Sequence, residues 1–405
     1  MNYLEKLLQG APVEWKTLGE LGNFYGGLTG KSKKDFEQGN AKYITYMNVF
    51  TNIATDLDSE NWVKVGDEER QNKIAYKDIL FTGSSETPNE CGMTSVVNQP
   101  IAEDIYLNSF CFGFRFDSEF IDIFDPDFLK YLFRGNLLRR EITRTANGVT
   151  RFNISKKKME KIKIPIPPLS VQKEIARILD ALTALTSELT SELTSELTLR
   201  QKQYQYYRDK LLTFGDEVEW KTLGDIGQVK MCKRILKKDT SPDGEIPFYK
   251  IGTFGKKADA FISRKLYEDY KEKYSFPKKG DILISASGTI GRTVIYDGEP
   301  AYFQDSNIVW IDNNEKIVLN KFLWHLYKVI KWSVAEGGTI NRLYNDNIRK
   351  IKIPIPPIEE QKRIAAILDK FHTLTSSLSD GLPKEIELRQ KQYEYYRDLL
   401  LGFGK

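Results

Sequence analysis

The residues that could do catalytic chemistry are few, and their spacing argues against catalysis. The segment GGLTGKS at 26–32 resembles a phosphate-binding loop, but three residues separate Gly26 from Gly30 where that loop needs four. No buried strand is expected before it, and the second half of the chain has no equivalent segment. We therefore expect no nucleotide site here.

A second segment, DPDF at 125–128, is similar to the acidic-Pro-Pro-aromatic motif of adenine methyltransferases. Asp127 stands where that motif has a proline, and no Gly-rich cofactor loop accompanies it. The same letters are typical of a helix start, with Asp125 as the N-cap and Pro126 in the first turn. The segment therefore predicts a helix start and no methyltransferase site.

Histidines and cysteines offer no better candidates. His325 falls on an expected amphipathic helix, and His372 aligns with a threonine in another copy of its segment, so neither suits a general base or a metal ligand. The three cysteines, Cys91, Cys111 and Cys232, form no Cys-x-x-Cys pair, and their odd number argues against a disulfide framework. The sequence predicts no catalytic residue, bound cofactor or metal in this chain.

Two clusters of basic residues point to DNA instead. Residues 130–163 hold eleven Lys and Arg against two acidic residues, and residues 230–238 hold five basic residues and no acidic one. Interleaved with Tyr, Phe and Gln, such clusters suit a phosphate backbone and base edges. A solvated charged face would explain either cluster alone, but a cluster in both halves favours DNA.

Eight basic residues lie in expected loops or beside Gly-rich turns where DNA could approach. These candidate contacts are Lys33, Lys34, Arg144 and Arg151 in the first half, and Lys256, Arg264, Arg292 and Arg342 in the second. The sequence does not decide which of them read bases and which hold phosphates.

Internal repetition indicates how these residues are positioned. The repeated segments are KIKIPIPP at 161–168 and 350–357, VEWKTLGELG at 13–22 with VEWKTLGDIG at 218–227, and LRQKQYQYYRDKLLTFG at 199–215 with LRQKQYEYYRDLLLGFG at 388–404. Between them lie two inserts, about 23–160 and 228–349, that share almost no letters. The chain is therefore two half-molecules, in which a constant frame holds variable inserts.

The repeat also closes on itself. The segment YLEKLLQGAPVEW at 3–15 is similar to YYRDKLLTFGDEVEW at 206–220, so the chain begins with the tail of a unit whose head stands at the C-terminus. This circular organisation predicts that the termini lie close together and that the molecule has a pseudo-twofold axis.

KIKIPIPP suits neither a helix interior nor a central strand, because each proline lacks the N–H that either needs. We expect an extended edge segment that leads into a helix. After the first copy, an apolar stripe with spacings of three and four residues predicts a coiled-coil helix from Val171 to Leu212. The second copy carries the same stripe until Gly381 and Pro383 interrupt it, so the two helices are expected to pair as an antiparallel coiled coil.

The inserts are predicted to be mixed α/β domains and diverged copies of one another. KDILFTGSS at 77–85 parallels GDILISASG at 280–288, and helical spacing follows in both, over 128–142 and over 322–334. A Gly-x-Thr then stands at the same distance before each KIKIPIPP, at Gly148–Thr150 and at Gly337–Thr339.

This arrangement resembles the specificity subunit of type I restriction-modification enzymes. The near-identical blocks IPIPPLSVQKEIARILDALTALTSEL and IPIPPIEEQKRIAAILDKFHTLTSSL, with ELRQKQYEYYRD near the C-terminus, carry the resemblance, which spans essentially the whole chain. The repeat TSELTSELTSEL at 186–197 matches the family's four-residue repeat of variable length. The second helix departs from that repeat with SSLSDGLPKE.

The resemblance implies a non-catalytic protein that reads double-stranded DNA. Each insert would be a target recognition domain for one half of a bipartite, asymmetric site, and the paired helices would set the gap and dock two methyltransferase subunits. Those partners would bring S-adenosylmethionine, and motor-nuclease restriction subunits would bring ATP and Mg²⁺.

The expected domains follow the repeat boundaries. They are an N-terminal stub at 1–22, a first target recognition domain at 23–168, a central helical spacer at 169–215, a second target recognition domain at 216–357 and a C-terminal helical spacer at 358–405. The expected fold is thus two mixed α/β domains separated by two long helices.

Two other functions would each explain part of the sequence. A coiled-coil scaffold for two proteins would explain the repeats but not the basic clusters, and a nonspecific DNA-bridging protein would explain the clusters but not why the inserts diverge on a constant frame. The divergence favours two unlike readers. No run of about 18 apolar residues and no secretory signal is visible, so we expect a cytoplasmic protein without a membrane segment.

Overall fold

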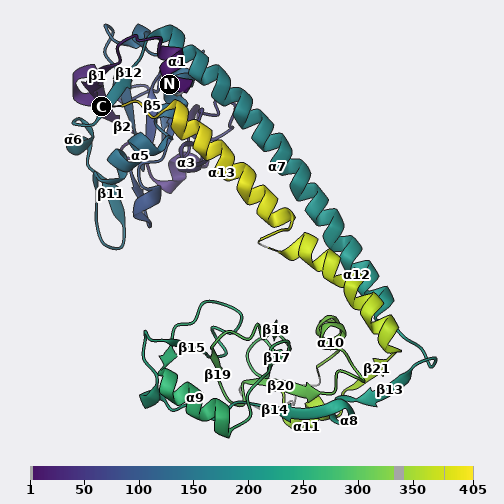
Figure 1. Cartoon of the computed structure of the whole chain (residues 1–405). Coiled ribbons are helices and arrows are strands. Elements are labelled where there is room, and N and C mark those ends of the chain that lie inside the picture. Colours follow the sequence, from purple (N-terminus) through teal and green to yellow (C-terminus); the bar gives the residue numbers. More distant parts are fainter. Residues whose placement is uncertain (1–2, 333–341, 378, 405) are drawn as a thin grey trace. The chain divides into compact units, whose positions relative to one another are not determined.

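The computed structural model describes residues 3–332, 342–377 and 379–404. They form two compact units, one made of residues 1–192 and 386–405 and the other of residues 193–385. Each unit combines one mixed α/β domain with stretches of long helix (Figure 1). The boundary between the two units falls inside the long helix, whereas the expected domain boundaries follow the sequence repeat. The expected domain boundaries therefore stay a prediction.

Unit 1 contains the first insert and both ends of the chain. Its elements are α1 (Tyr3–Leu8), β1 (Glu14–Thr17), α2 (Leu18–Leu21), β2 (Gly22–Gly26), β3 (Ala41–Ile44), α3 (Tyr46–Thr51), β4 (Trp62–Val63), β5 (Ile79–Thr82), β6 (Ser84–Ser85), β7 (Thr94–Val96), β8 (Ile105–Leu107), β9 (Cys111–Phe116), α4 (Pro126–Leu132), α5 (Asn136–Thr143), β10 (Ala146–Asn147), β11 (Phe152–Ile154), α6 (Lys156–Met159), β12 (Lys163–Ile166), the first part of α7 (Leu169–Leu211) and most of α13 (Leu382–Leu400).

Unit 2 contains the second insert. Its elements are the rest of α7, β13 (Glu219–Thr222), α8 (Leu223–Ile226), β14 (Gly227–Lys230), β15 (Ile246–Tyr249), β16 (Phe261–Ile262), α9 (Arg264–Lys273), β17 (Ile282–Ser285), β18 (Thr293–Ile295), β19 (Tyr302–Phe303), β20 (Ile308–Asn313), α10 (Asn320–Leu326), α11 (Asn345–Arg349), β21 (Lys352–Ile355) and α12 (Ile358–Ser376).

The two main sheets have the same topology in both α/β domains, and unit 1 adds a small sheet of order β10-β11-β6. The first is built on an antiparallel sheet of order β2-β9-β5-β7, and the second on one of order β14-β20-β17-β18. A three-stranded sheet accompanies each, β4-β3-β8 in one and β16-β15-β19 in the other, and both contain one parallel pair. The prediction that the inserts are diverged mixed α/β copies of one domain is confirmed.

KIKIPIPP forms the edge segment that its prolines predict. In each unit it pairs with the repeated VEWKT segment in a separate two-stranded sheet, β1-β12 or β13-β21. Trp15 stands opposite Pro165, and Trp220 stands opposite Pro354. Because these sheets have only two strands, the N–H groups that the prolines lack break no ladder on a second side.

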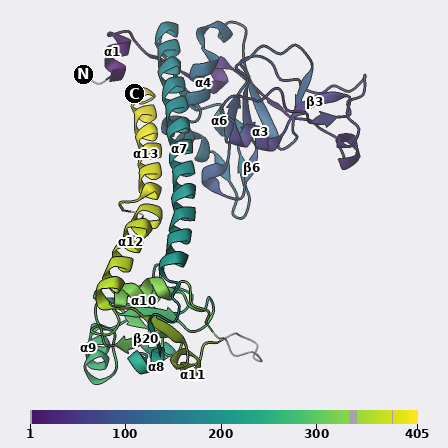
Figure 2. The same ribbon diagram turned by 90° about the vertical axis from the view of Figure 1, so that its right-hand side faces the viewer.

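The helices also largely follow the sequence. The helix expected from Val171 to Leu212 is α7, and the interruption expected near Gly381 separates α12 from α13. A Cβ atom at Gly381 would lie 2.4 Å from the Thr373 carbonyl oxygen, so this turn has no room for a side chain. Figure 2 shows α13 beside the first part of α7 and α12 beside its later part.

Two helix predictions need correction. The segment 128–142 is broken into α4 and α5, because the chain turns at Gly135, whose N–H bonds to the Tyr131 carbonyl at 2.8 Å. The helix expected over 322–334 ends at Leu326 and continues as turns. Val334 and the Gly337–Thr339 segment lie outside the described residues. The start of α4 is as predicted, since the Asp125 carboxylate accepts a hydrogen bond from the Phe128 N–H at 3.0 Å.

A buried glutamine joins each α/β domain to the helix that comes after it. In unit 1, the Gln172 amide oxygen accepts from the Asp125 N–H at 2.9 Å, and its nitrogen donates to the Ile123 and Pro167 carbonyls at 2.8 Å each. In unit 2, Gln361 makes the same three bonds, with Leu319, Ile317 and Pro356, at 2.9, 3.0 and 2.8 Å. Both side chains are fully buried.

The two chain ends share one core. Leu4 from α1 packs in the same buried cluster as Leu400, Leu401 and Phe403 from the end of the chain. The prediction that the termini lie close together is confirmed within unit 1. No helix among the described residues is both long and apolar enough to span a membrane.

Replacing Gln172 should destabilise unit 1. Gln172→Ala leaves one N–H and two carbonyls without their buried partner, and we expect a loss of about 2–4 kcal/mol in the free energy of unfolding. Gln361→Ala should cost unit 2 a similar amount. Urea denaturation measures both, with the exposed Gln201→Ala on α7 as the matched control. Losses within about 0.5 kcal/mol for the buried pair, as expected for the control, would contradict this role.

Candidate nucleic-acid interface

Three basic residues of the first cluster are bound within the protein, so, contrary to the expectation, the cluster at 130–163 is not available to DNA as a whole. Lys130 is buried and pairs with Asp127 and Asp180, at 2.8 Å each. Arg134 and Arg139 donate hydrogen bonds to backbone carbonyl oxygens. Desolvation lowers the pKa of each guanidinium to about 10, so both still carry a charge at neutral pH. Sequence letters do not distinguish such cations from exposed ones.

The half-buried Arg134 and Arg139 hold the end of helix α3 and the 86–91 loop. Arg134 donates through Nη2 to the Val49 and Phe50 carbonyls, at 3.0 and 2.9 Å, which end helix α3. Arg139 donates through Nη2 to the Asn89 and Cys91 carbonyls, at 3.0 and 2.8 Å. Helix α3 and the 86–91 loop form two walls of an open groove, so these arginines position a surface that they do not reach.

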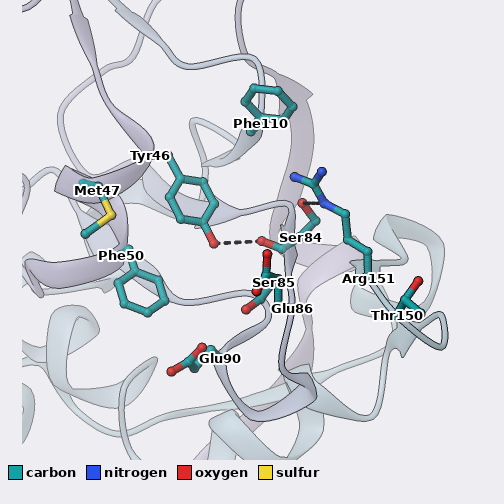
Figure 3. Close-up of a pocket in the computed structure, with 10 residues that line it drawn as sticks. All are labelled: Tyr46, Met47, Phe50, Ser84, Ser85, Glu86, Glu90, Phe110, Thr150 and Arg151. Carbon is teal, nitrogen blue, oxygen red and sulfur yellow. Dashed lines mark hydrogen bonds between the residues drawn. The ribbon is translucent and has the colours of Figure 1, made fainter. Parts of the chain in front are cut away.

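This open groove has a volume of about 780 Å³ and is a candidate interface of unit 1 (Figure 3). Its lining residues are Tyr46, Met47, Phe50, Ser84, Ser85, Glu86, Glu90, Phe110, Thr150 and Arg151. Two large apolar side chains there are strongly exposed, Met47 at 57% and Phe110 at 58%. Exposed apolar side chains gathered in one groove are typical of a binding surface.

Hydrogen bonds fix the centre of the groove. The Tyr46 hydroxyl donates to the Ser84 carbonyl at 2.8 Å, and Arg151 Nε donates to Ser84 Oγ at 3.2 Å. Arg151 follows a tight turn between β10 and β11 in which Gly148 has φ +138, and a Cβ atom at Gly148 would lie 2.0 Å from the Arg151 carbonyl oxygen. The turn therefore needs glycine to bring Arg151 back over β6.

Of the four candidate contacts in unit 1, the groove contains one. Arg151 lines it, whereas Lys33 and Lys34 are exposed on a 3₁₀ helix at Lys33–Phe36. Arg144 is 72% exposed at the end of α5 and pairs with Glu141 at 2.8 Å. The aromatic side chains Tyr46, Phe50 and Phe110 were not predicted from the sequence, because only the fold shows that they line one groove.

In unit 2, two candidates approach one hairpin. Arg292 stands at the base of the β17–β18 hairpin and donates through Nη1 to the Phe254 carbonyl at 3.0 Å, in the same turn as Lys256. Arg342 donates to the Ser306 carbonyl at 3.0 Å and bridges to Ser287 on the hairpin. Arg264 lies apart from them as the first residue of α9, where it pairs with Glu245 at 3.3 Å.

The groove of unit 1 and the hairpin of unit 2 occupy equivalent places in the fold. The Ile154 N–H bonds to the Gly83 carbonyl at 3.0 Å, and the Leu343 N–H bonds to the Ala286 carbonyl at 2.8 Å. In both domains, the residue that directly follows the central strand β5 or β17 thus accepts a hydrogen bond from the segment that leads into KIKIPIPP. The two domains present different side chains at this shared position.

No catalytic centre accompanies these surfaces in the part of the chain that the structure describes. His325 is buried and bonds to Asp369 at 2.8 Å, and burial lowers its pKa to about 4, so it is neutral at pH 7. Burial raises the pKa of Cys111 and Cys232 to about 12, which keeps both as thiols. Among the described residues, no group of three or more His, Cys, Asp or Glu side chains could hold a metal ion.

Comparisons with known proteins identify the family. The model of the type I restriction modification DNA specificity domain matches twice, at residues 12–199 and 215–388. This chain belongs to the type I restriction-modification specificity subunits. It is therefore the DNA-recognition subunit of such a system and not a catalytic one, as the sequence predicted.

Individual relatives agree with the family. A putative type I restriction enzyme specificity subunit of Haemophilus influenzae, S.HindORF215P, is 51% identical over 408 residues, which cover 100% of this chain and 99% of that protein. The EcoR124I/EcoR124II specificity subunit of Escherichia coli is 33% identical over 443 residues, with 100% and 98% coverage.

Solved structures share the fold. A chain from a study of complex assembly and conformational transition of the type I R-M system has a TM-score of 0.63 at 18% identity, covering 96% of this specificity subunit and 98% of that chain. The HsdS subunit from Thermoanaerobacter tengcongensis has a TM-score of 0.55 at 16% identity, with 97% and 96% coverage.

Proposed function

We propose that this specificity subunit reads a bipartite, asymmetric double-stranded DNA site, one half with each α/β domain, in a type I restriction-modification complex. The observation that carries the proposal is the pair of domains with one topology and unlike surfaces at equivalent positions. Two different readers on one repeated frame recognise two different half-sites. The eight candidate basic residues are proposed to contact DNA within these half-sites, as base readers or as phosphate contacts.

A selection from random duplexes tests this reading. The chain, purified in complex with its methyltransferase subunits, should enrich a motif of two fixed parts separated by an unread gap. Unselective binding would favour a nonspecific DNA-bridging protein, and no binding would favour a protein scaffold. Binding should also weaken steeply as salt rises, because phosphate contacts release counterions.

The gap is proposed to be set by an antiparallel coiled coil of α7 with α12 and α13. Contacts within each unit support this pairing. In unit 1, Thr183 Oγ1 donates to the Tyr393 hydroxyl at 3.1 Å, and in unit 2 the Tyr207 ring stacks on Phe371 with centroids 5.6 Å apart. A helix of the length expected from Val171 to Leu212 would span about 63 Å, or about 18 base pairs at ~3.4 Å each.

Deleting one TSEL unit, residues 190–193, should shorten the gap and leave both half-sites unchanged. The deletion removes about 6 Å of helix and rotates the remainder of the helix by about 40°, without touching either domain. Mapping the methylated motif before and after the deletion measures the gap, which we expect to shrink by one or two base pairs. A constant gap, or altered bases in either half-site, would show that the helices are not the spacer.

We further infer that the repeated frame docks two copies of one partner, the methyltransferase subunit. Tyr206 on α7 is 59% exposed, and its repeat counterpart Tyr395 on α13 is 64% exposed. The packing of each unit does not require a tyrosine at these exposed positions. A partner that binds both positions would require the same side chain at each. The methyltransferase subunits would bring S-adenosylmethionine, and restriction subunits would bring ATP and Mg²⁺. The complex is proposed to act in the cytoplasm, where the DNA lies.

Truncating these tyrosines should weaken docking at one site each. Exposed aromatic anchors are frequent hot spots of interfaces, so Tyr206→Ala and Tyr395→Ala should each lower the affinity for one of two methyltransferase subunits by about tenfold or more. Native mass spectrometry counts the bound subunits. Glu192→Ala, an exposed position on α7 outside the blocks shared by the two halves, serves as the control. Full occupancy in the double tyrosine variant would contradict this docking surface.

A further inference from the structure

The guanidinium of Arg151 is held in a defined plane. Its Nε donates to Ser84 Oγ at 3.2 Å, and its central carbon lies 5.7 Å from the centroid of the Phe110 ring. Figure 3 shows the guanidinium between Ser84 and Phe110, facing Tyr46 across the groove. Within the described chain, no interaction uses its two terminal nitrogens. A pre-oriented fork of N–H donors is therefore presented to the groove.

Other arginines of the candidate interfaces lack this combination. Arg144 lies outside the groove and is paired with Glu141. Arg292 has both terminal nitrogens in use, with the Phe254 carbonyl at 3.0 Å and Thr289 Oγ1 at 3.2 Å. Arg151 thus combines terminal N–H donors that no interaction within the described chain uses with an oriented guanidinium inside the groove.

The chemistry that matches such a fork is a pair of adjacent acceptors in one plane. The O6 and N7 atoms of guanine form this pair in the major groove, and Arg is their commonest reader. A phosphate can also accept a fork. The surroundings favour the base, because Met47, Phe50 and Phe110 line the same groove and apolar side chains suit base edges and thymine methyl groups better than a charged phosphate.

We propose that Arg151 reads a guanine through O6 and N7 in the half-site of the first domain, with Ser84 and Phe110 as positioning residues. This inference rests on the proposed function and adds to it the base and the atoms that are read. It makes the groove of unit 1 a base-reading site, supported from inside by Arg134 and Arg139.

The test uses the full chain in complex with its methyltransferase subunits. Methylation mapping first supplies the motif, and each guanine of the first half-site is then replaced in turn by 7-deazaguanine, which lacks N7. We expect the complex that carries Arg151 to bind the duplex about 5- to 150-fold more weakly when one particular guanine is replaced. Arg151→Ala should bind the normal duplex with a loss in that range and be indifferent to the replacement at that guanine.

Two further variants separate a base contact from a phosphate contact. Arg151→Lys keeps the charge and would preserve a phosphate contact, but it lacks the planar fork and should behave like Arg151→Ala. Ser84→Ala should cause a smaller loss confined to the same guanine, because it frees the guanidinium to rotate. The preference at the second half-site should stay unchanged in every variant, which shows that each one folds and assembles.

Three results would overturn the proposal. A first half-site without a G·C pair would do so at once. The others are a uniform loss of affinity for all sequences in Arg151→Ala, and a 7-deazaguanine penalty that persists in that variant. Failure of the proposed function itself would be distinguishable, because the complex that carries Arg151 would then yield no two-part motif in the first step of the test.

Discussion

The rest of the molecule depends on one buried side chain in each unit, the glutamine that comes after KIKIPIPP. Gln172 and Gln361 each link three parts of their unit: the segment that follows the edge strand, the start of α4 or α10, and the helix on which the glutamine itself lies. A buried amide with all three bonds satisfied permits one arrangement, since any shift leaves polar groups unpaired. The recognition domain is thereby held to its helix in a fixed orientation.

A fixed join explains why the inserts can differ so widely. The frame sets where the central sheet and its hairpin stand, so the surface loops can change without altering the join. In unit 1 this freedom produces a groove lined by Tyr46, Phe110 and Arg151, and in unit 2 a hairpin approached by Arg292 and Arg342. Under the proposed function, specificity would lie in these loops, which tolerate change, and spacing would lie in the long helices.

Charge alone was an incomplete guide to the interface. The cluster at 130–163 was expected to face DNA, yet Lys130 is buried, Arg134 and Arg139 are half-buried, and they pair with carboxylates or donate to carbonyl oxygens. Two of them nevertheless support the walls of the groove. The break of the helix at Gly135 was missed for a related reason, because periodic apolar letters continue across a turn when both helices pack on one core.

The sequence by itself determined the repeats, the edge role of KIKIPIPP, the extent of α7, the shared α/β class of the inserts and the meeting of the chain ends. Each of these follows from local rules, namely proline chemistry, apolar spacing and identity of letters. Only the tertiary structure decided which basic residues are buried, which aromatic side chains are exposed and that Arg151 meets Ser84 and Phe110. Those outcomes depend on contacts between residues far apart in the chain, which no local pattern contains.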